Sequence, residues 1–506
     1  MPRGTIFSPP RGYFLMQCGR NRSIVFIFCM AIAPPSTLPL PDSPGTRGKD
    51  GRELLTTLTL AAPIMAGHVG QMLMGLVDTL MIGRVGVADL AASALANNLF
   101  HIILVFGLGL LTSISVLAAN AHGAGEAQEV GRTLRRGLHL GVLTGTVLGL
   151  LFLLAFPLLN HLGQEPEVVE KARPYLLFLL ASLPFAFAQM AFKNFSEALA
   201  SPWPAFWTSL IAIGANVFLN WVFIFGNLGA PAMGLTGAGL ATFIARVLSL
   251  VLLFAWLAAV PRFRSYFPRR WAALSRWSEL WLLIRLGFPI ALQILCEVLI
   301  FSVTAIVIGV LGMEALAAHQ IAITCAATTF MMPLGLAMAL TIRVSHVIGE
   351  NHPARLIPIC RSALLFTVGQ ALVFALGYIL FRYHLAALFI SDPAVARLAA
   401  QLLFLAGCFQ VVDGLQAVAM GALRGLKDVR VPTVMTVFAY WVVAFPLGLY
   451  LGFATPLGVH GFWIAFCLGL LLIAVGLVAR VIRQVRRAQH TGHHVPTPTP
   501  VQPAPR

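Results

Sequence analysis

The sequence predicts an all-α polytopic membrane protein with twelve transmembrane helices in two pseudo-symmetric six-helix lobes. Of its 506 residues, 58% are hydrophobic and only 10% are charged, whereas a soluble domain carries about 25% charged residues. Apolar stretches of about 20 residues, long enough to cross a bilayer, recur along the chain. The chain also repeats one of its own segments. These features exclude a soluble globular fold.

The repeat indicates two similar halves. Leu60–Ile64 reads Leu-Ala-Ala-Pro-Ile and is matched by Leu286–Ile290, which reads Leu-Gly-Phe-Pro-Ile. In the same register, Leu90–Ala92 is matched by Leu316–Ala318. A large apolar chain built from two similar halves is typical of membrane carriers, whose site lies between the halves. Six helices in each half would give both lobes the same orientation, related by a pseudo-twofold axis along the membrane normal.

Each expected helix is an apolar stretch with few charges. In order along the chain, they are expected at 56–82, 90–117, 137–159, 173–193, 205–226, 234–260, 280–311, 314–341, 361–381, 398–422, 432–453 and 457–481. Stretches longer than about 25 residues are expected to tilt or kink. The domains that follow are an N-terminal lobe at 54–260, a basic linker at 261–279 and a C-terminal lobe at 280–482.

The charges of the loops predict the orientation in the membrane. Lys and Arg gather in alternate loops, including the linker and a loop to which we assign Arg424, Lys427 and Arg430. The opposite loops carry mainly acidic residues. Because basic loops stay on the cytoplasmic side, both termini are predicted to be cytoplasmic. The formal net charge of +16 is therefore interpreted as a topology signal, not as a sign of nucleic-acid binding.

The two ends of the chain are expected to lie outside the lobes. Residues 1–53 are interpreted as a cytoplasmic extension that is disordered or results from a start-site artefact, with translation beginning at Met30. The apolar run Ile24–Ala33 is too short to span a bilayer; a signal-peptide core is the alternative, although Pro34-Pro35 is a poor cleavage context. Residues 483–506, rich in Pro, Thr and His, are expected to form a disordered cytoplasmic tail.

Three acidic residues, Asp78, Glu297 and Asp413, fall inside expected transmembrane helices. A charge at mid-bilayer costs about 2.5–3.5 kcal/mol on insertion scales, so each one needs a reason. The alternative to a function is a structural acid held by hydroxyls or by an arginine on another helix. Desolvation raises the pKa of a carboxyl, so a buried acid can hold a proton or, when ionised, bind sodium or a cationic solute. Such competition between two ligands is what antiport requires.

Other polar and helix-breaking residues accompany these acids. Asn216 and Asn220 are four residues apart and so share a helix face, where they could complete the oxygen shell of a cation or join helices. For Arg246 we favour an ion pair with one of the acids over solute binding. Pro63 and Pro289 occupy matching repeat positions and are expected to kink their helices, as bendable elements or as static kinks.

Several motifs are absent from the sequence. It contains no Gly-x-x-x-x-Gly-Lys-Ser/Thr phosphate loop, no His-Glu-x-x-His and no Gly-x-Ser-x-Gly. We therefore expect no enzymatic activity, no cofactor and no direct use of ATP. The energy for transport would come from an ion gradient.

In several segments the chain resembles the multidrug and toxic compound extrusion (MATE) family, in its bacterial NorM-like branch. The resemblance covers about residues 54–482 and depends on Val77-Asp78-Thr79, Leu90–Ala92, Asn216–Trp221, Arg285–Pro289 with Glu297, His319-Gln320, Ile342–Val344, and Asp413 with Gly421–Gly425. It implies a multi-pass antiporter of the bacterial inner membrane. Such a protein would expel organic cations and amphipathic drugs against sodium or proton entry.

The resemblance also implies roles for individual residues. Glu297 and Asp413 would form the cation site of the C-terminal lobe, where sodium could bind, and Asp78 would join in coupling. Asp78, Asn216 and Asn220 would form the polar cluster of the N-terminal lobe. The expected partners are small-molecule drugs and membrane lipid, without nucleic acid or ATP, and the protein is expected to be a monomer.

Two other functions are considered. A flippase for a lipid-linked precursor shares the two-lobe plan but needs basic residues in the central cavity for a pyrophosphate, and Arg246 alone is expected to lie deep. A receptor or scaffold that transports nothing would tolerate neutralisation of all three buried acids.

Overall fold

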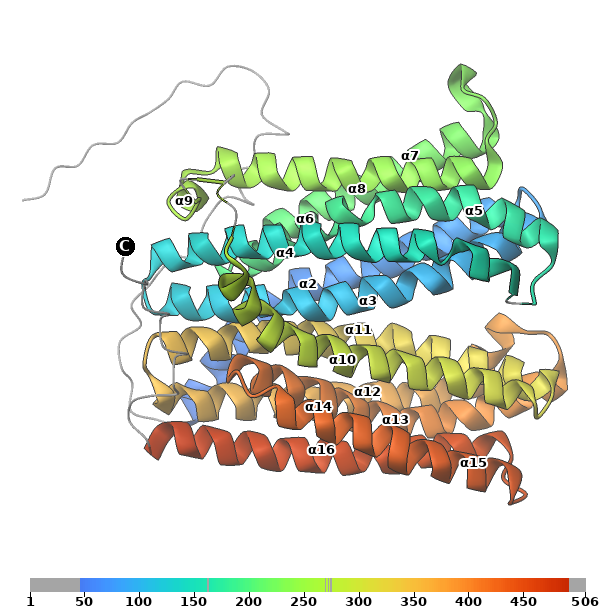
Figure 1. The fold of residues 1–506 in the computed structure, drawn as a ribbon. Helices are drawn as coiled ribbons and strands as arrows, with labels where there is room; N and C mark the ends of the chain where they lie inside the picture. Colours follow the sequence, from blue (N-terminus) through green and yellow to red (C-terminus); the bar gives the residue numbers. More distant parts are fainter. Residues whose placement is uncertain (1–45, 162, 269, 272, 274, 491–506) are drawn as a thin grey trace, which may run out of the picture. The chain divides into compact units, whose positions relative to one another are not determined.

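The computed structural model describes residues 46–490 apart from residues 162, 269, 272 and 274. The predictions on Met30, on Ile24–Ala33 and on residues 491–506 lie outside the described residues. The described elements, drawn in Figure 1, are helices and no strands: α2 Thr46–Gly83, α3 Val87–Gly123, α4 Ala127–Leu154, η1 Phe156–His161, α5 Pro166–Ala181, α6 Leu183–Ala198, α7 Trp203–Phe225, η2 Asn227–Gly229, α8 Gly234–Ala259, α9 Pro261–Arg264, α10 Trp277–Gly309, α11 Met313–Gly349, η3 Pro353–Arg355, α12 Leu356–Phe389, α13 Pro393–Gly425, α14 Arg430–Val437, η4 Phe438–Ala444, α15 Phe445–Phe453 and α16 Val459–His490.

The all-α fold with twelve transmembrane helices is confirmed. Twelve helices or series of consecutive helices of the described chain are long and apolar enough to cross a membrane. The fourth consists of α5 and α6, which are separated at Ser182, two residues before Pro184. The eleventh runs from α14 through the π-helix η4 into α15. A proline near the start of α6 explains the first interruption, because its ring cannot donate the backbone hydrogen bond of a continuous helix.

The helices gather into two lobes, α2–α8 and α10–α16. Figure 1 shows α4, α5, α6 and α8 together on one side and α10–α16 on the other. The apolar core of the first lobe is built around residues such as Phe187 and Leu176, and that of the second around Trp463 and Leu423. The fully buried Trp463 and Phe187 are among the largest side chains of these cores.

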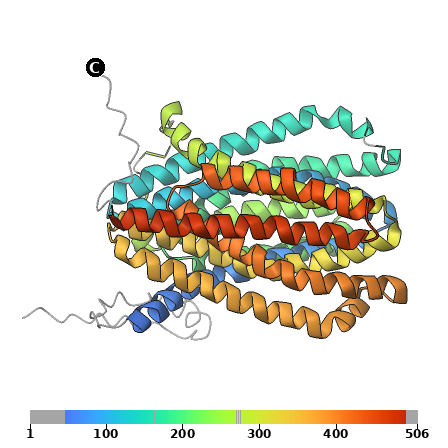
Figure 2. The same ribbon diagram turned by 90° about the horizontal axis from the view of Figure 1, so that it is seen from below.

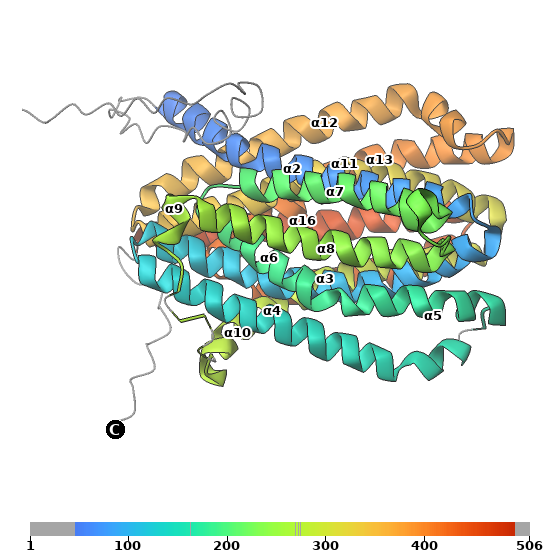
Figure 3. The same ribbon diagram turned by 90° about the horizontal axis from the view of Figure 1, so that it is seen from above.

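The helix α2 takes part in both lobes. Leu60, Ala61 and Ile64, in its first half, belong to the apolar core of the C-terminal lobe. Its start lies beside α12, as Figures 2 and 3 both show. Its second half packs on α7 of the N-terminal lobe. The first helix of the chain therefore connects the two lobes through packing as well as through sequence.

The ends of α2 and α16 differ from the predicted domain boundaries. The helix α2 begins at Thr46 and α16 continues to His490, so 46–53 and 483–490 are helical where disordered ends were predicted. Tertiary contacts account for the difference. Glu53 is ion-paired to Arg343, and Gln484 donates to Asp428 at 2.9 Å, so polar residues that look solvated in the sequence have partners in the fold.

We use "basic end" for the end of the helix bundle where α2 begins and α16 ends, and "acidic end" for the opposite one. Glycines allow the lobes to approach closely toward the basic end. A Cβ added to Gly109 would lie 2.3 Å from the Cα atom of Ala291, and one added to Gly287 would lie 2.1 Å from the carbonyl oxygen of Leu110. The helices α3 and α10 can meet at this distance only because neither glycine carries a side chain.

Replacing Gly109 by alanine is therefore expected to destabilise the protein by about 1–3 kcal/mol, the usual cost of overpacking. The matched control is Gly67→Ala in α2, where an added Cβ meets no atom within 4 Å and helix propensity favours alanine. Thermal unfolding of both variants in detergent checks the difference. Equal melting temperatures would contradict the close approach of α3 and α10.

Candidate functional site

The N-terminal lobe holds a polar cluster made of the predicted residues Asp78, Asn216 and Asn220. The side-chain amide of Asn220 donates to Asp78 Oδ1 at 2.6 Å and lies 3.2 Å from Asn216 Oδ1. Asn216 in turn donates to the hydroxyl of Thr242 on α8, at 3.4 Å. Both asparagines are fully buried. Their spacing of one helical turn on α7 places the two carboxamides side by side, Asn220 toward Asp78 of α2 and Asn216 toward α8, so a carboxylate and amide oxygens converge within the lobe.

Arg246 makes no direct ion pair with an acid among the described residues, but its charge interacts with that of Asp78, the acid of the same lobe. The Arg246 guanidinium donates to the hydroxyl of Ser182 at 2.6 Å and lies 4.5 Å from the ring centroid of Phe100. The interruption between α5 and α6 at Ser182 provides the hydroxyl, and the aromatic face of Phe100 provides a cation–π contact.

The C-terminal lobe brings Glu297 and Asp413 together. Glu297 Oε1 accepts from Gln416 Nε2 at 3.3 Å and lies 3.4 Å from the hydroxyl of Tyr440. That hydroxyl also lies 3.2 Å from Gln416 Oε1. Asp413, only 5% exposed, stands three residues before Gln416 on α13 and is close enough to Glu297 for their charges to interact. Two carboxylates whose charges interact therefore lie inside one lobe.

Gln416 and Tyr440 were not singled out from the sequence. Gln416 has a signal that could have found it, since it follows Asp413 by three residues and so shares its helix face. Tyr440 lies in η4, a π-helix within an otherwise apolar segment, and a π-helix cannot be read from hydropathy. Such single-turn π-helices are frequent at functional sites.

Arg424 was assigned to a basic loop, and this prediction is wrong. It lies in the last turn of α13, is only 7% exposed and donates to Gln293 Oε1 at 2.9 Å. Because helical side chains point back toward the start of their helix, an arginine at this position reaches into the lobe. Lys427, two residues beyond α13, does lie in a loop, where burial lowers the pKa of its amine and Glu126 opposes that shift.

A further buried pair in the N-terminal lobe was also missed. Lys193 and Glu197 stand one turn apart on α6, 3.9 Å from each other, and Glu197 is almost fully buried. The charge of Lys193 also interacts with His68 of α2. The Nε2 atom of His68 lies 3.3 Å from the sulfur of Met338 on α11. The predicted span at 173–193 ended too early to place Glu197 inside a helix.

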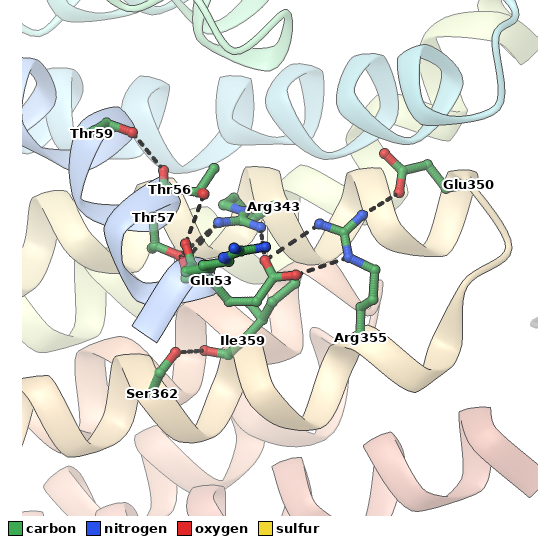
Figure 4. Close-up of polar contacts among 10 residues, drawn as sticks. Glu53, Thr56, Thr57, Thr59, Arg343, Glu350, Arg355, Ile359 and Ser362 are labelled. Atoms are coloured by element: carbon green, nitrogen blue, oxygen red, sulfur yellow. Dashed lines mark hydrogen bonds and ion pairs between the residues drawn. The ribbon is translucent and has the colours of Figure 1, made fainter. Parts of the chain in front are cut away.

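At the basic end, polar contacts join α2 to the C-terminal lobe. We call the residues that make them the Glu53 network: Glu53, Thr57, Arg343, Glu350 and Arg355. Figure 4 shows Glu53 of α2 between the two arginines of the C-terminal lobe. Arg343 pairs with the Glu53 carboxylate and donates to the Glu53 carbonyl at 2.8 Å and to Thr57 at 3.2 Å. Arg355 bridges Glu53 and Glu350, at 3.0 Å from each.

Other polar contacts between the lobes lie at the same end. Asn120 of α3 donates to the carbonyl of Ser345 at 3.3 Å and accepts from Lys427 at 2.8 Å. Arg136 of α4 lies 3.4 Å from Glu279 of α10. Together with the Glu53 network, these hydrogen bonds and ion pairs hold the lobes together at the basic end.

The two predicted kink prolines, Pro63 and Pro289, lie inside the continuous helices α2 and α10. The carbonyl of Pro289 accepts from the hydroxyl of Thr433 at 2.9 Å. No cluster of three or more His, Cys, Asp or Glu side chains suited to a metal ion occurs among the described residues. The carboxylates and amides of the two lobes are oxygen donors, the ligand type that suits hard monovalent cations.

Two repeated six-helix lobes, each with a carboxylate among amide and hydroxyl groups, define a polytopic membrane protein of the secondary transporter class. A family model described as MatE matches residues 63–222 and 289–450, one segment in each lobe. The chain belongs to the MatE family, and the resemblance described from its motifs is confirmed.

Named relatives and a solved structure agree with this assignment. A probable multidrug resistance protein NorM of Mesorhizobium japonicum is 39% identical, with 86% of this chain and 95% of the relative covered. The multidrug resistance protein PmpM of Pseudomonas aeruginosa is 35% identical, with 88% and 95% covered. The crystal structure of the Vibrio cholerae MATE transporter VcmN in the bent form has the same fold, with a TM-score of 0.78 at 21% identity, covering 88% of this chain and 99% of that one.

Proposed function

We propose that the protein is a secondary antiporter that exports cationic or amphipathic drugs and toxic compounds, driven by sodium or proton influx. The observation that carries the proposal is the pair of buried, interacting carboxylates, Glu297 and Asp413, inside the C-terminal lobe, with Asp78 in the interior of the other lobe. Relatives named as multidrug resistance proteins support the class of solute.

A buried carboxylate suits antiport because it can hold either a cation or a proton, but not both. Ion entry at Glu297 and Asp413, with Asp78 joining in coupling, favours release of the solute. Asn216 and Asn220 orient Asp78 and offer amide oxygens to a bound cation. Each ligand shifts the equilibrium between the two orientations of the lobes only by its difference in affinity for them.

The basic end is assigned to the cytoplasm because arginine-rich loops stay on that side. The lobes, which are joined at the basic end, are then closed toward the cytoplasm. Both termini face the cytoplasm. We place the protein in the bacterial inner membrane, acting as a monomer on small molecules without ATP. Pro63 and Pro289 are proposed as the bendable points of α2 and α10.

A flippase for a lipid-linked precursor is less well supported. Its pyrophosphate needs basic side chains that are available in the cavity. Arg246 is engaged by Ser182 and Phe100, and Arg343 by Glu53.

The test is efflux of a fluorescent organic cation from proteoliposomes under a sodium gradient alone or a proton gradient alone. A response to one gradient establishes antiport and identifies the coupling ion. Absence of a response to either gradient overturns the proposal and favours the flippase, which lipid-linked precursor scrambling would then test.

Replacing Tyr440 by phenylalanine is expected to lower the apparent affinity for the coupling ion about fivefold, because a hydrogen bond near Glu297 contributes about 1 kcal/mol. The ion concentration for half-maximal efflux measures this effect. Tyr450→Phe is the control, since Tyr450 is 64% exposed and should leave that concentration unchanged. An unchanged value in Tyr440→Phe would remove Tyr440 from the ion site.

A further inference from the structure

Arg424 is a buried cation inside the C-terminal lobe. Arginines at helix ends usually extend their charged heads toward water, but this one is only 7% exposed. It donates to Gln293 Oε1 at 2.9 Å, and its Nε has no hydrogen-bond partner among the described residues. Because a neutral amide does not compensate a buried charge, the guanidinium requires negative charge nearby.

That negative charge comes from the candidate ion site. Gln293, which accepts from Arg424, stands one turn before Glu297 on α10. No direct ion pair joins Arg424 to Glu297 among the described residues, but their charges interact across this turn. Glu297 in turn interacts with Asp413. The side chains that hydrogen-bond to Glu297, Gln416 and Tyr440, are neutral. Around Glu297, the described part of the chain thus supplies two carboxylates and one guanidinium.

The charge of this group limits what it can bind. Arginine stays protonated in proteins, so its positive charge is permanent and cannot be exchanged during a transport cycle. With both carboxylates ionised the group has one uncompensated negative charge. One monovalent cation or one proton neutralises this charge. Without Arg424, two cations or protons would be needed to remove the cost of burying the two carboxylates.

We propose that Arg424 is a specificity-determining residue of the ion site, whose fixed charge compensates one of the two carboxylates and sets the uptake to one monovalent cation or proton per cycle. The inference rests on the proposed antiport and deepens it. It assigns Glu297 and Arg424 as a charge-compensated pair and leaves Asp413 as the group that exchanges the ion. Arg424 acts through the carboxylates and makes no contact with the solute.

The test compares the ion dependence of efflux in wild type and five variants, with sodium varied at constant pH in one arm and pH varied without sodium in the other. Wild type, Arg424→Lys and the surface control Arg430→Gln are expected to show a Hill coefficient of about 1, and Arg424→Gln one that approaches about 2. The double variant Glu297→Gln/Arg424→Gln restores a single uncompensated carboxylate. It is expected to regain ion-driven efflux that Glu297→Gln alone lacks, with a coefficient of about 1.

A wild-type Hill coefficient in Arg424→Gln, or a double variant as inactive as Glu297→Gln, would overturn the inference. Thermal unfolding in detergent provides a second readout that needs no transport. Arg424→Gln should melt at a lower temperature than the double variant, because it leaves two buried carboxylates uncompensated; additive losses would overturn the pairing. If wild type responds to neither ion gradient, the proposed antiport fails, and the melting temperatures still decide whether Arg424 compensates Glu297.

Discussion

Replacing Glu297 by glutamine is expected to abolish ion-driven efflux while the protein remains folded and inserted. Glutamine keeps the shape of the side chain and can still contact Gln416 and Tyr440, which lie 3.3 Å and 3.4 Å from Glu297 Oε1. It cannot carry a negative charge, so the fixed charge of Arg424 compensates Asp413 instead and no net charge remains for an ion to neutralise. The interaction with Asp413 and with any entering cation is therefore lost, and with it the step that couples ion entry to release of the solute.

Efflux from proteoliposomes under each ion gradient measures this loss, and the melting temperature in detergent shows whether the variant is folded. The matched control is Glu314→Gln, because Glu314 is an exposed acid at the start of α11. Its efflux should equal that of wild type. Full activity in Glu297→Gln would remove Glu297 from the coupling step, whereas a protein that fails to insert would show that its role is structural.

The contrast between these two acids also explains what the sequence could predict. Glu297, Asp413 and Asp78 are recognisable because a charge within an apolar stretch is costly and therefore informative. The partners that complete their sites carry a weaker signal. Gln416 and Tyr440 are neutral, and the π-helix that holds Tyr440 and packs on α16 is not recorded in hydropathy.

Arg424 shows why charge alone misplaces residues near helix ends. In the sequence it stands beside Lys427 and Arg430, and the three look like one basic loop. In the fold, α13 continues to Gly425, so that the Arg424 side chain turns into the lobe while Arg430 stays exposed. When a helix ends two or three residues later than predicted, a residue that looks like part of a basic loop belongs to the helix instead. Arg424 is therefore part of a buried charge group and does not indicate the orientation in the membrane.

The twelve helices themselves followed directly from apolar length, and their ends did not. Glu53, with Arg52 beside it, lies among polar residues that predict a solvated extension. The helix continues through this segment because the opposite charge is supplied by Arg343, which is distant in the sequence. A tertiary ion pair of this kind cannot be recognised until both helices are placed side by side.

This ion pair leads to the second large effect, which concerns the closure of the basic end. Replacing Glu53 by glutamine leaves the Arg343 guanidinium, whose side chain is only 8% exposed, without its carboxylate. Removing one partner of a buried pair costs about 3–5 kcal/mol. Because the pair joins α2 to α11, we expect the loss to shift the lobes toward an arrangement that is open at the basic end, by a factor of more than about 100.

The matched control uses the exposed arm of the Glu53 network. The Arg355 side chain is 44% exposed, and an ion pair in such a position contributes about 0–1 kcal/mol. Arg355→Gln should therefore change the closure little, although it lies 3.0 Å from the same carboxylate. The two variants differ in burial and share the partner, which separates the effect of the buried pair from that of local charge.

Distances between spin labels on the basic ends of α4 and α12 would measure the opening in lipid nanodiscs. Glu53→Gln should populate a longer distance that wild type and Arg355→Gln lack. If all three proteins gave the same distribution, the Glu53 network would not control closure. In that case the close packing of α3 on α10, where Gly109 meets Ala291, would be the contact that holds the basic end shut, and Gly109→Ala should then produce the longer distance.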